Sequence, residues 1–230
     1  MKIFLILVIF FLGGFVYFLF PISDNSSPEY FKWKAEYDQD ALTQASMEKV
    51  LLDTNFNFDR VELIEVGPGK VYYSLWGHLI LRFVGSGKTS EEDLSLSFLA
   101  YFSDFPVNRY KASFGGYTVL PKLAYYKNYV EEYQIEEKRF MHAYPITLTQ
   151  NQKDTLLLKL RSWVIDKSKP GTYSFMLNNC VGVMIKLFIE SDIIPKGQLV
   201  EKRRYPNEVA GIFLKFGLIR QEDYLVYANE

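Results

Sequence analysis

The sequence predicts an α+β domain, with strands in its first half and helices in its second half. Two observations lead to this fold class. Short apolar runs bounded by glycine-containing turns lie between residues 61 and 102, and longer segments with a helical spacing of apolar residues follow from residue 150 onward. Strands followed by helices are typical of α+β proteins. No internal repeat or low-complexity segment is visible, so we expect a single domain over residues 34–230.

The amino terminus is an uncharged apolar run from Ile3 to Phe20, long enough to span a bilayer or nearly so. We favour an uncleaved membrane anchor over residues 1–22 to a cleaved signal peptide, because the run ends in large residues instead of the small residues of a cleavage site. Lys2 precedes the run and acidic residues follow it, which places the bulk of the chain in the periplasm or outside the cell. Residues 23–33 read as a polar linker.

The elements of the domain follow from local patterns. The spacing of apolar residues predicts helices over 34–52, 122–133, 150–166, 180–191 and from about 206 onward. Extended patterns predict strands over 61–66, 71–75, 78–84, 94–102 and 138–148. Thr149 and Gln152 form a capping box at the start of the third helix. Turns are expected at 67–69, 85–90, 115–117 and 169–171.

The composition argues against several classes of partner. The chain has 26 basic and 27 acidic residues and a net charge of −1, so a nucleic-acid partner is not expected. Its 2 histidines and 1 cysteine are isolated along the chain, so we expect neither a metal site nor a cofactor. Tyrosine and phenylalanine are abundant, which fits both an aromatic core and a surface that works near an apolar ligand.

Cys180 is the first candidate for chemistry. It follows Asn178 and Asn179, which are good helix N-cap residues, and precedes an apolar run with helical spacing. The cysteine is therefore expected in the first turn of a buried helix, where free N–H groups and the helix dipole lower the pKa of a thiol. A lone cysteine is more often a small buried apolar residue, so its reactivity depends on a partner. An unpaired thiol outside the cytoplasm is either inert or kept for chemistry.

His78 is the better candidate for that partner. It opens a predicted strand directly after Gly77, and the alternation puts His78, Ile80 and Arg82 on one face, with Leu79, Leu81 and Phe83 on the other. A histidine at this place is expected to face a helix terminus and to take the proton of the Cys180 thiol. His142 lies in the middle of a predicted strand and is expected to be structural.

These motifs together resemble a known family. Tyr73 to Arg82 resembles its Ser-x-Phe-Gly-His-x-x-Leu-Arg signature, Tyr129 to Leu148 with Glu137 and Arg139 is similar to its central block, and Tyr173 to Cys180 resembles its Asn-Cys motif. The family is named for the amino-terminal periplasmic domain of Lnb, a bacterial lipoprotein N-acyltransferase. It is counted among the circularly permuted papain-like thiol enzymes.

The resemblance implies a permuted papain-like fold in which an antiparallel sheet packs against the helix of the nucleophile. It implies that Cys180 is the nucleophile and His78 the base. The chain departs from the family over residues 95–101, where relatives carry a Tyr-Gly element. The third polar residue, which orients the histidine, therefore has two candidates, Ser74 and Ser97. Asn179 is an auxiliary candidate beside backbone N–H groups of the helix for the oxyanion hole.

The expected reaction is acyl transfer or hydrolysis through an acyl-thioester on Cys180, with a membrane lipid as partner and a lipoprotein as a candidate acceptor. Two alternatives stay open at this point. One is a peptidase or amidase of the cell envelope, since many papain-like enzymes have that activity. The other is a membrane-tethered binding domain that keeps the fold without the activity. The oligomeric state does not follow from the sequence.

Overall fold

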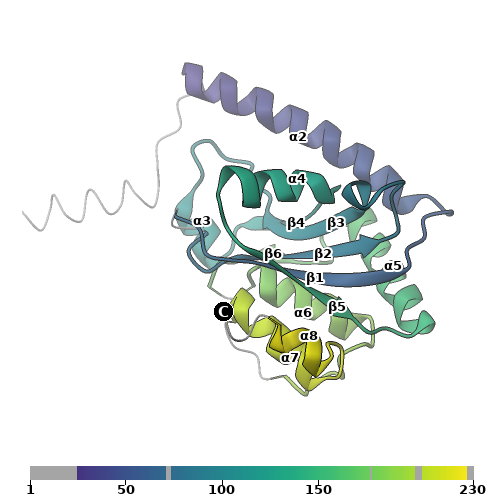
Figure 1. Ribbon diagram of the computed structural model, residues 1–230. Coiled ribbons are helices and arrows are strands. Elements are labelled where there is room, and N and C mark those ends of the chain that lie inside the picture. Colours follow the sequence, from purple (N-terminus) through teal and green to yellow (C-terminus); the bar gives the residue numbers. More distant parts are fainter. Residues whose placement is uncertain (1–24, 71–73, 177, 200–203, 227–230) are drawn as a thin grey trace, which may run out of the picture.

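A computed structural model describes residues 25–70, 74–176, 178–199 and 204–226. It shows an α+β fold around one six-stranded sheet in the order β5-β1-β2-β3-β4-β6, in which every neighbouring pair is antiparallel (Figure 1). The strands are β1 (Arg60–Val66), β2 (His78–Val84), β3 (Leu94–Ala100), β4 (Tyr117–Tyr125), β5 (Met141–Ile146) and β6 (Thr172–Tyr173). The predicted class is confirmed, and β1 and β2 begin and end within one residue of their predicted bounds.

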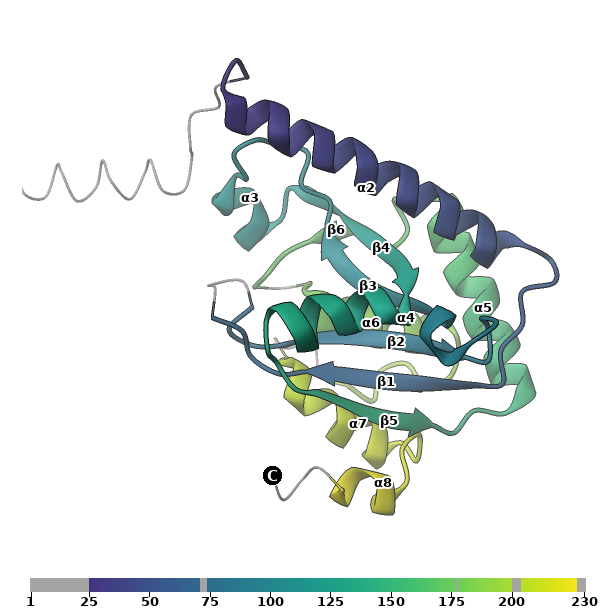
Figure 2. The same ribbon diagram turned by 45° about the horizontal axis from the view of Figure 1, so that its top comes forward.

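Helices cover both faces of the sheet. The α-helices are α2 (Pro28–Leu52), α3 (Arg109–Phe114), α4 (Tyr126–Val130), α5 (Gln150–Ile165), α6 (Cys180–Glu190), α7 (Val209–Lys215) and α8 (Gln221–Leu225). Figures 1 and 2 show α4 on one face of the sheet and α6, α7 and α8 on the other, while α2 runs beside β4. The capping box at Thr149 forms as predicted and starts α5.

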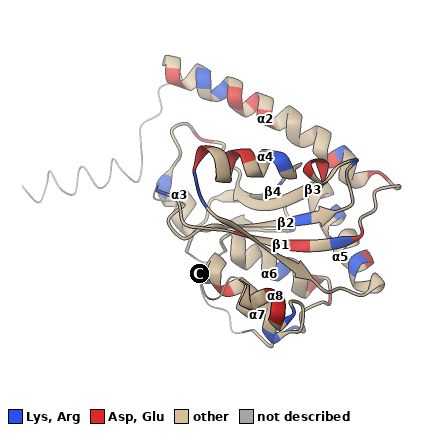
Figure 3. Cartoon of the chain, in the orientation of Figure 1, with Lys and Arg blue, Asp and Glu red and all other residues tan. Residues whose placement is uncertain are grey.

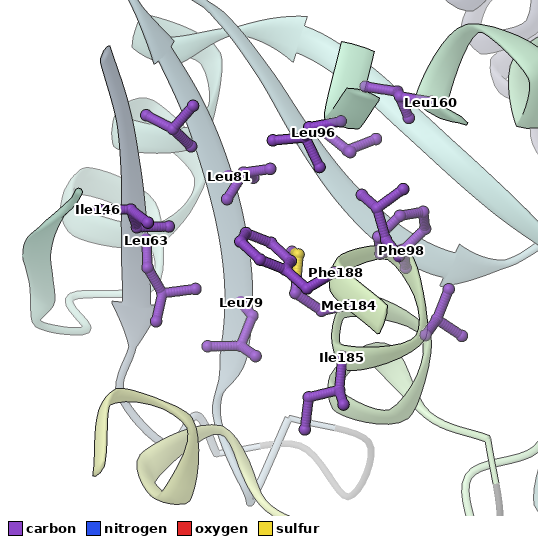
Figure 4. Close-up of a cluster of buried hydrophobic side chains, with 14 of the residues drawn as sticks. Leu63, Leu79, Leu81, Leu96, Phe98, Ile146, Leu160, Met184, Ile185 and Phe188 are labelled. Carbon is purple, nitrogen blue, oxygen red and sulfur yellow. The ribbon is translucent and has the colours of Figure 1, made fainter. Parts of the chain in front are cut away.

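The main core lies between the sheet and α6. One side of the central strands contributes Leu63, Leu79, Leu81 and Leu96, which belong to one buried cluster with α5 and α6. Figure 4 shows the strand residues directed toward Met184, Ile185 and Phe188 of α6. α6 is apolar over most of its surface, and seven of its residues are buried. A helix of this kind is stable only when it is covered on several sides, which fixes its place beneath the sheet.

A smaller core lies on the opposite face of the sheet. Ile64, Val66 and Ile80 pack there against Tyr129 and Tyr133, which come from α4 and from the π-helical turn Glu131–Glu136 that continues it. The sheet therefore separates two layers, and each side chain of β2 belongs to one or the other according to the alternation of the strand.

Three predicted segments differ from the structure. Residues 122–125, which we expected to be helical, complete β4, and the helix starts only at Tyr126. Of the predicted strand 71–75, residues 74 and 75 lie in a turn, and residues 71–73 lie outside the described part. α2 begins at Pro28 with Ser27 as its N-cap, so residues 28–33 belong to this helix and not to a linker. The Ser27 hydroxyl accepts from the N–H of Tyr30 and Pro28 suits the first turn, which explains the early start.

The predicted anchor, residues 1–22, lies outside the described residues. Among the helices that the structure describes, none is long and apolar enough to cross a membrane.

Candidate functional site

Cys180 is the first residue of α6, as the sequence predicts. Asn179 is the N-cap, and its side-chain oxygen accepts hydrogen bonds from the N–H groups of Val181 and Gly182, both at 3.1 Å. The amide nitrogen of the same side chain donates to the carbonyl of Arg204 at 3.1 Å. Asn179 is thus engaged at both ends of its amide. It fixes the start of α6 and joins it to the segment that follows residue 203.

The environment of the Cys180 sulfur favours the neutral thiol. Burial raises the pKa of this thiol to about 12, and backbone hydrogen bonds from Val181, Leu79 and Cys180 itself act in the opposite direction without cancelling the effect. The backbone groups at the helix start therefore lower the pKa of this thiol, as expected, but burial raises it by more. The side chain is only 7% exposed, and removal from water outweighs the helix terminus.

His78 is the first residue of β2 and follows a tight turn. The N–H groups of Gly69 and Gly77 both donate to the carbonyl of Ser74, at 2.8 and 3.0 Å. Gly77 has a φ of +85°, and a Cβ there would lie 2.5 Å from the carbonyl oxygen of Val66. Only glycine fits such a position, which explains the Gly-His sequence at the start of the strand.

The ring of His78 lies on the face of the sheet that α4 covers. Its centroid is 6.0 Å from the ring of Tyr133. Burial lowers the pKa of His78 to about 3, and the positive charges of Arg139 and Lys122 lower it in addition. The buried Nε2 atom has no hydrogen-bond partner within the described part of the chain. His78 is therefore a neutral imidazole at physiological pH, and its burial disfavours protonation in this environment.

Cys180 and His78 both lie near the start of β2, but on different faces of the sheet. The sulfur receives a backbone hydrogen bond from Leu79, the residue next to His78. Leu79 and Cys180 share the main core, whereas His78 opposes Val66, which belongs to the smaller core. In the described residues no hydrogen bond joins the thiol to the imidazole. The predicted sharing of faces along β2 is confirmed, but the face that carries His78 is not the one that packs on α6.

The two serine candidates have other contacts. The Ser97 hydroxyl is fully buried and lies 3.1 Å from the Tyr129 hydroxyl, so its contact is with α4 rather than with His78. The Ser74 hydroxyl lies close to Gly69, where an added Cβ would be 2.2 Å from it. Neither serine donates a hydrogen bond to the Nε2 atom of His78.

The residues that surround the His78 ring were not singled out for that role from the sequence. Arg139 is buried, and its Nε atom donates to the carbonyl of Gly67 at 2.6 Å. Its Nη1 atom pairs with Glu137 at 2.7 Å, and the guanidinium lies 4.8 Å from the centre of the Tyr133 ring. Arg139 thus stacks on the tyrosine that packs against His78. An arginine two residues after a glutamate was visible in the sequence, but the contact of Arg139 with Gly67, directly after β1, depends on the tertiary fold.

His142 lies on β5 opposite Glu65 of β1, on the side of the sheet that carries Cys180. Its ring stacks on Phe140 at 4.4 Å, and burial raises the pKa of the neighbouring Glu65, an effect that His142 partly opposes. No group of three or more histidine, cysteine, aspartate or glutamate side chains that could hold a metal ion occurs in the described residues.

No curated protein and no solved structure matches this chain. Residues 48–206 match the family described as the Lnb N-terminal periplasmic domain. This segment is more than half of the chain and includes both His78 and Cys180. The periplasmic character of the domain agrees with the extracytoplasmic location predicted from the amino terminus. The chain therefore belongs to the family of the Lnb N-terminal periplasmic domain.

Proposed function

We propose that the protein is a membrane-anchored thiol acyltransferase or hydrolase that works outside the cytoplasm on a lipid or lipoprotein, on a permuted papain-like fold. One observation carries the proposal. The only thiol of the chain is the first residue of a capped helix, and backbone hydrogen bonds reach it both from that helix and from Leu79, the neighbour of the buried, unprotonated His78. Nucleophile and base therefore stand at one end of β2.

The first half of the reaction forms a thioester. The Cys180 thiol gives its proton to the imidazole of His78, and the sulfur attacks the ester carbonyl of the acyl donor. The bond from the carbonyl carbon to the alcohol oxygen breaks, and the alcohol leaves with the proton from His78. In the second half an amine or water attacks the thioester, the carbon–sulfur bond breaks, and the thiol is restored. Thioesters react readily with amines, which suits transfer to a lipoprotein amino terminus.

Backbone groups supply the oxyanion contacts in this proposal. Asn179 already occupies the N–H groups of Val181 and Gly182. The N–H groups of Cys180 and Leu79 also act on the sulfur, and in this proposal they are the oxyanion donors. Donors aimed at the position where charge develops contribute roughly 3–4 kcal/mol to the transition state when they are fixed in advance. Leu79 is held by β2 and Cys180 by α6, so both are rigid.

The two faces of the sheet set a requirement for the mechanism. His78 has to reach the thiol past the end of β2, where the strand begins at Gly77. Catalytic hydrogen bonds are often long or poorly aligned before substrate binds and tighten in the complex. We propose that the ring of His78 leaves its contact with Tyr133 when substrate enters.

The test is formation of an acyl adduct. The full chain is incubated with phospholipid that carries a labelled acyl chain, and the intact mass and label are measured. We expect an adduct on the wild type that Cys180→Ser and His78→Ala abolish, while His142→Ala retains it as the matched histidine control. An adduct that survives His78→Ala and disappears in His142→Ala would assign the base to β5 instead. No adduct, with turnover of peptidoglycan fragments, would overturn acyl transfer in favour of an envelope peptidase or amidase.

A further inference from the structure

A group of large apolar side chains is exposed at the end of the domain that carries the candidate site. Their exposed fractions range from 37% to 56%, although each belongs to a described turn or helix. We call these residues the aromatic rim: Leu75, Trp76, Tyr110, Phe114 and Met176. Single apolar residues on a surface are normal, but several that gather on one end mark a contact surface.

Contacts between the segments make the rim one continuous surface. Trp76, in the turn before β2, lies 4.8 Å from the ring of Phe175. The N–H groups of Phe175 and Met176 donate to the carbonyls of Ala112 and Ser113 in α3, at 2.9 and 3.1 Å. On α3 the rings of Tyr110 and Phe114 are 5.1 Å apart. The turn before β2, the turn before α6 and α3 thus form one patch.

The aromatic rim borders the candidate site on two sides. Trp76 directly precedes Gly77 and His78, and Met176 lies in the segment that leads to Cys180. Tyr205 stacks on Trp76 with a centroid separation of 6.4 Å, and its neighbour Arg204 accepts the hydrogen bond from Asn179. A ligand that approaches Cys180 from this end passes these side chains.

The position of the amino terminus identifies what the rim contacts. The apolar run ends at Phe20, and α2 starts at Pro28. A fully extended chain gains at most about 3.5 Å per residue, so residues 21–27 reach no further than about 25 Å. The first turns of α2 pack on the segment before α3, with the ring of Trp33 5.4 Å from that of Phe105. In Figures 1 and 2, α3 lies on the same side of the domain as the start of α2.

The chemistry of the rim fits a lipid interface. Tryptophan and tyrosine prefer the region of the headgroups, because an apolar ring and a polar group are both accommodated there. α3 carries Arg109 and Lys111 and no acidic residue, and it shows blue in Figure 3; Lys111 pairs with Asp104 of the preceding segment at 2.8 Å. The first half of α2, in contrast, carries charges of both signs, with pairs such as Lys32–Glu36.

We propose that the aromatic rim lies in the headgroup region of the bilayer and that the Cys180 end of the domain opens toward lipid. This inference rests on the proposed function for the role of the site. It adds the surface and the orientation: α3 and the turns at Trp76 and Met176 face the membrane, and α5 faces away from it.

The test measures depth in the bilayer for the full chain. In a Cys180→Ser background, Leu75→Cys and Phe114→Cys are labelled with an environment-sensitive fluorophore, and the protein is placed in vesicles of phosphatidylcholine with a minority of phosphatidylglycerol. The matched control is Leu158→Cys on α5, an exposed leucine like Leu75. We expect nitroxide lipids to quench the label at positions 75 and 114 several-fold more than at 158. The labelled side chains are exposed, so the substitutions remove no core contact.

Equal quenching at all three positions would overturn the proposed orientation. The acyl adduct is measured separately on the wild type, so the two proposals fail independently. An adduct without quenching at the rim would leave the function and overturn the docking surface. Quenching at the rim without an adduct would support the docking surface and overturn acyl transfer.

Discussion

Cys180 and His78 are both held in their uncharged forms, and the same cause acts on both. Burial raises the pKa of the thiol to about 12 and lowers the pKa of the imidazole to about 3. Removal from water disfavours any charged form, so the free protein does not hold a thiolate–imidazolium pair. In the proposed mechanism the proton moves only after substrate has brought the two groups together.

Arg139 is expected to keep His78 neutral. Its guanidinium stacks on Tyr133 beside the imidazole, and its charge is the second cause of the low pKa after burial. Arg139→Gln removes this charge, so the pKa of His78 should rise toward 6.5, while Arg139→Lys should keep much of the shift. NMR titration of the two histidines measures both variants, and His142 serves as the internal reference. An unchanged His78 titration in Arg139→Gln would show that burial alone sets the pKa.

His78 should also make the protein sensitive to acid. The pKa of this residue is 6.5 in the unfolded chain and about 3 in the folded chain. Between these pH values, the unfolded chain binds a proton at His78 and the folded chain does not. As the pH is lowered through that window, the free energy of unfolding therefore decreases, by up to about 1.4 kcal/mol per pH unit. His78→Asn removes this contribution, so urea denaturation should show the wild type losing more stability than the variant between pH 7 and pH 4. Parallel losses in both proteins would contradict the burial of a neutral histidine.

Among the elements, those with strong local signals agree with the sequence. The capping box at Thr149, the asparagine cap before Cys180 and the alternation in β2 all depend on neighbouring residues, and each predicted its element. β4 was missed because the apolar spacing from residue 122 onward favoured a helix, although residues 122–125 belong to the strand. In the structure β4 pairs with β3 on one side, and near Pro121 its other edge meets the side chain of Gln44 instead of a strand. That contact comes from α2, far away in the sequence.

The candidate site shows the same limit. The sequence told which residues of β2 share a face, but not which face α6 would cover. α6 packs against Leu79 and Leu81 because these apolar side chains match its own surface, and this leaves His78 on the other side. The environment of His78, with Tyr133 and Arg139, depends on segments more than fifty positions away and had no local signal.

Gln44 is expected to stabilise the edge of β4. Its amide donates to the carbonyl of Pro121 at 2.9 Å and accepts from the N–H of Leu123 at 2.9 Å. Gln44→Ala leaves both buried backbone groups without these partners, which costs roughly 1–3 kcal/mol for each group that stays unpaired. Gln39→Ala, at an exposed position of the same helix, is the control and should change stability by less than about 0.5 kcal/mol. Equal urea midpoints for the two variants would contradict the edge contact.

At the scale of the whole molecule, the sheet separates two layers, and the candidate site lies near the start of β2. Cys180 belongs to the layer with α5, α6 and α7, and His78 to the layer with α4. The aromatic rim lies at the same end, and its segments around Trp76 and Met176 are those that we propose to lie against lipid.

This arrangement predicts slow reaction of the native thiol. With a pKa near 12 rather than 9, the thiolate at neutral pH is on the order of a thousandfold scarcer in the folded chain than in the unfolded chain. Monobromobimane at pH 7 should accordingly label Cys180 on the order of a thousandfold more slowly in buffer than in concentrated urea. The folded rate should rise about tenfold per pH unit up to pH 10. Cys180 is the only cysteine, so the signal needs no correction for other sites. A labelling rate that levels off between pH 7 and pH 9 would mean that the helix start does stabilise the thiolate, and it would restore an ion pair in the resting site.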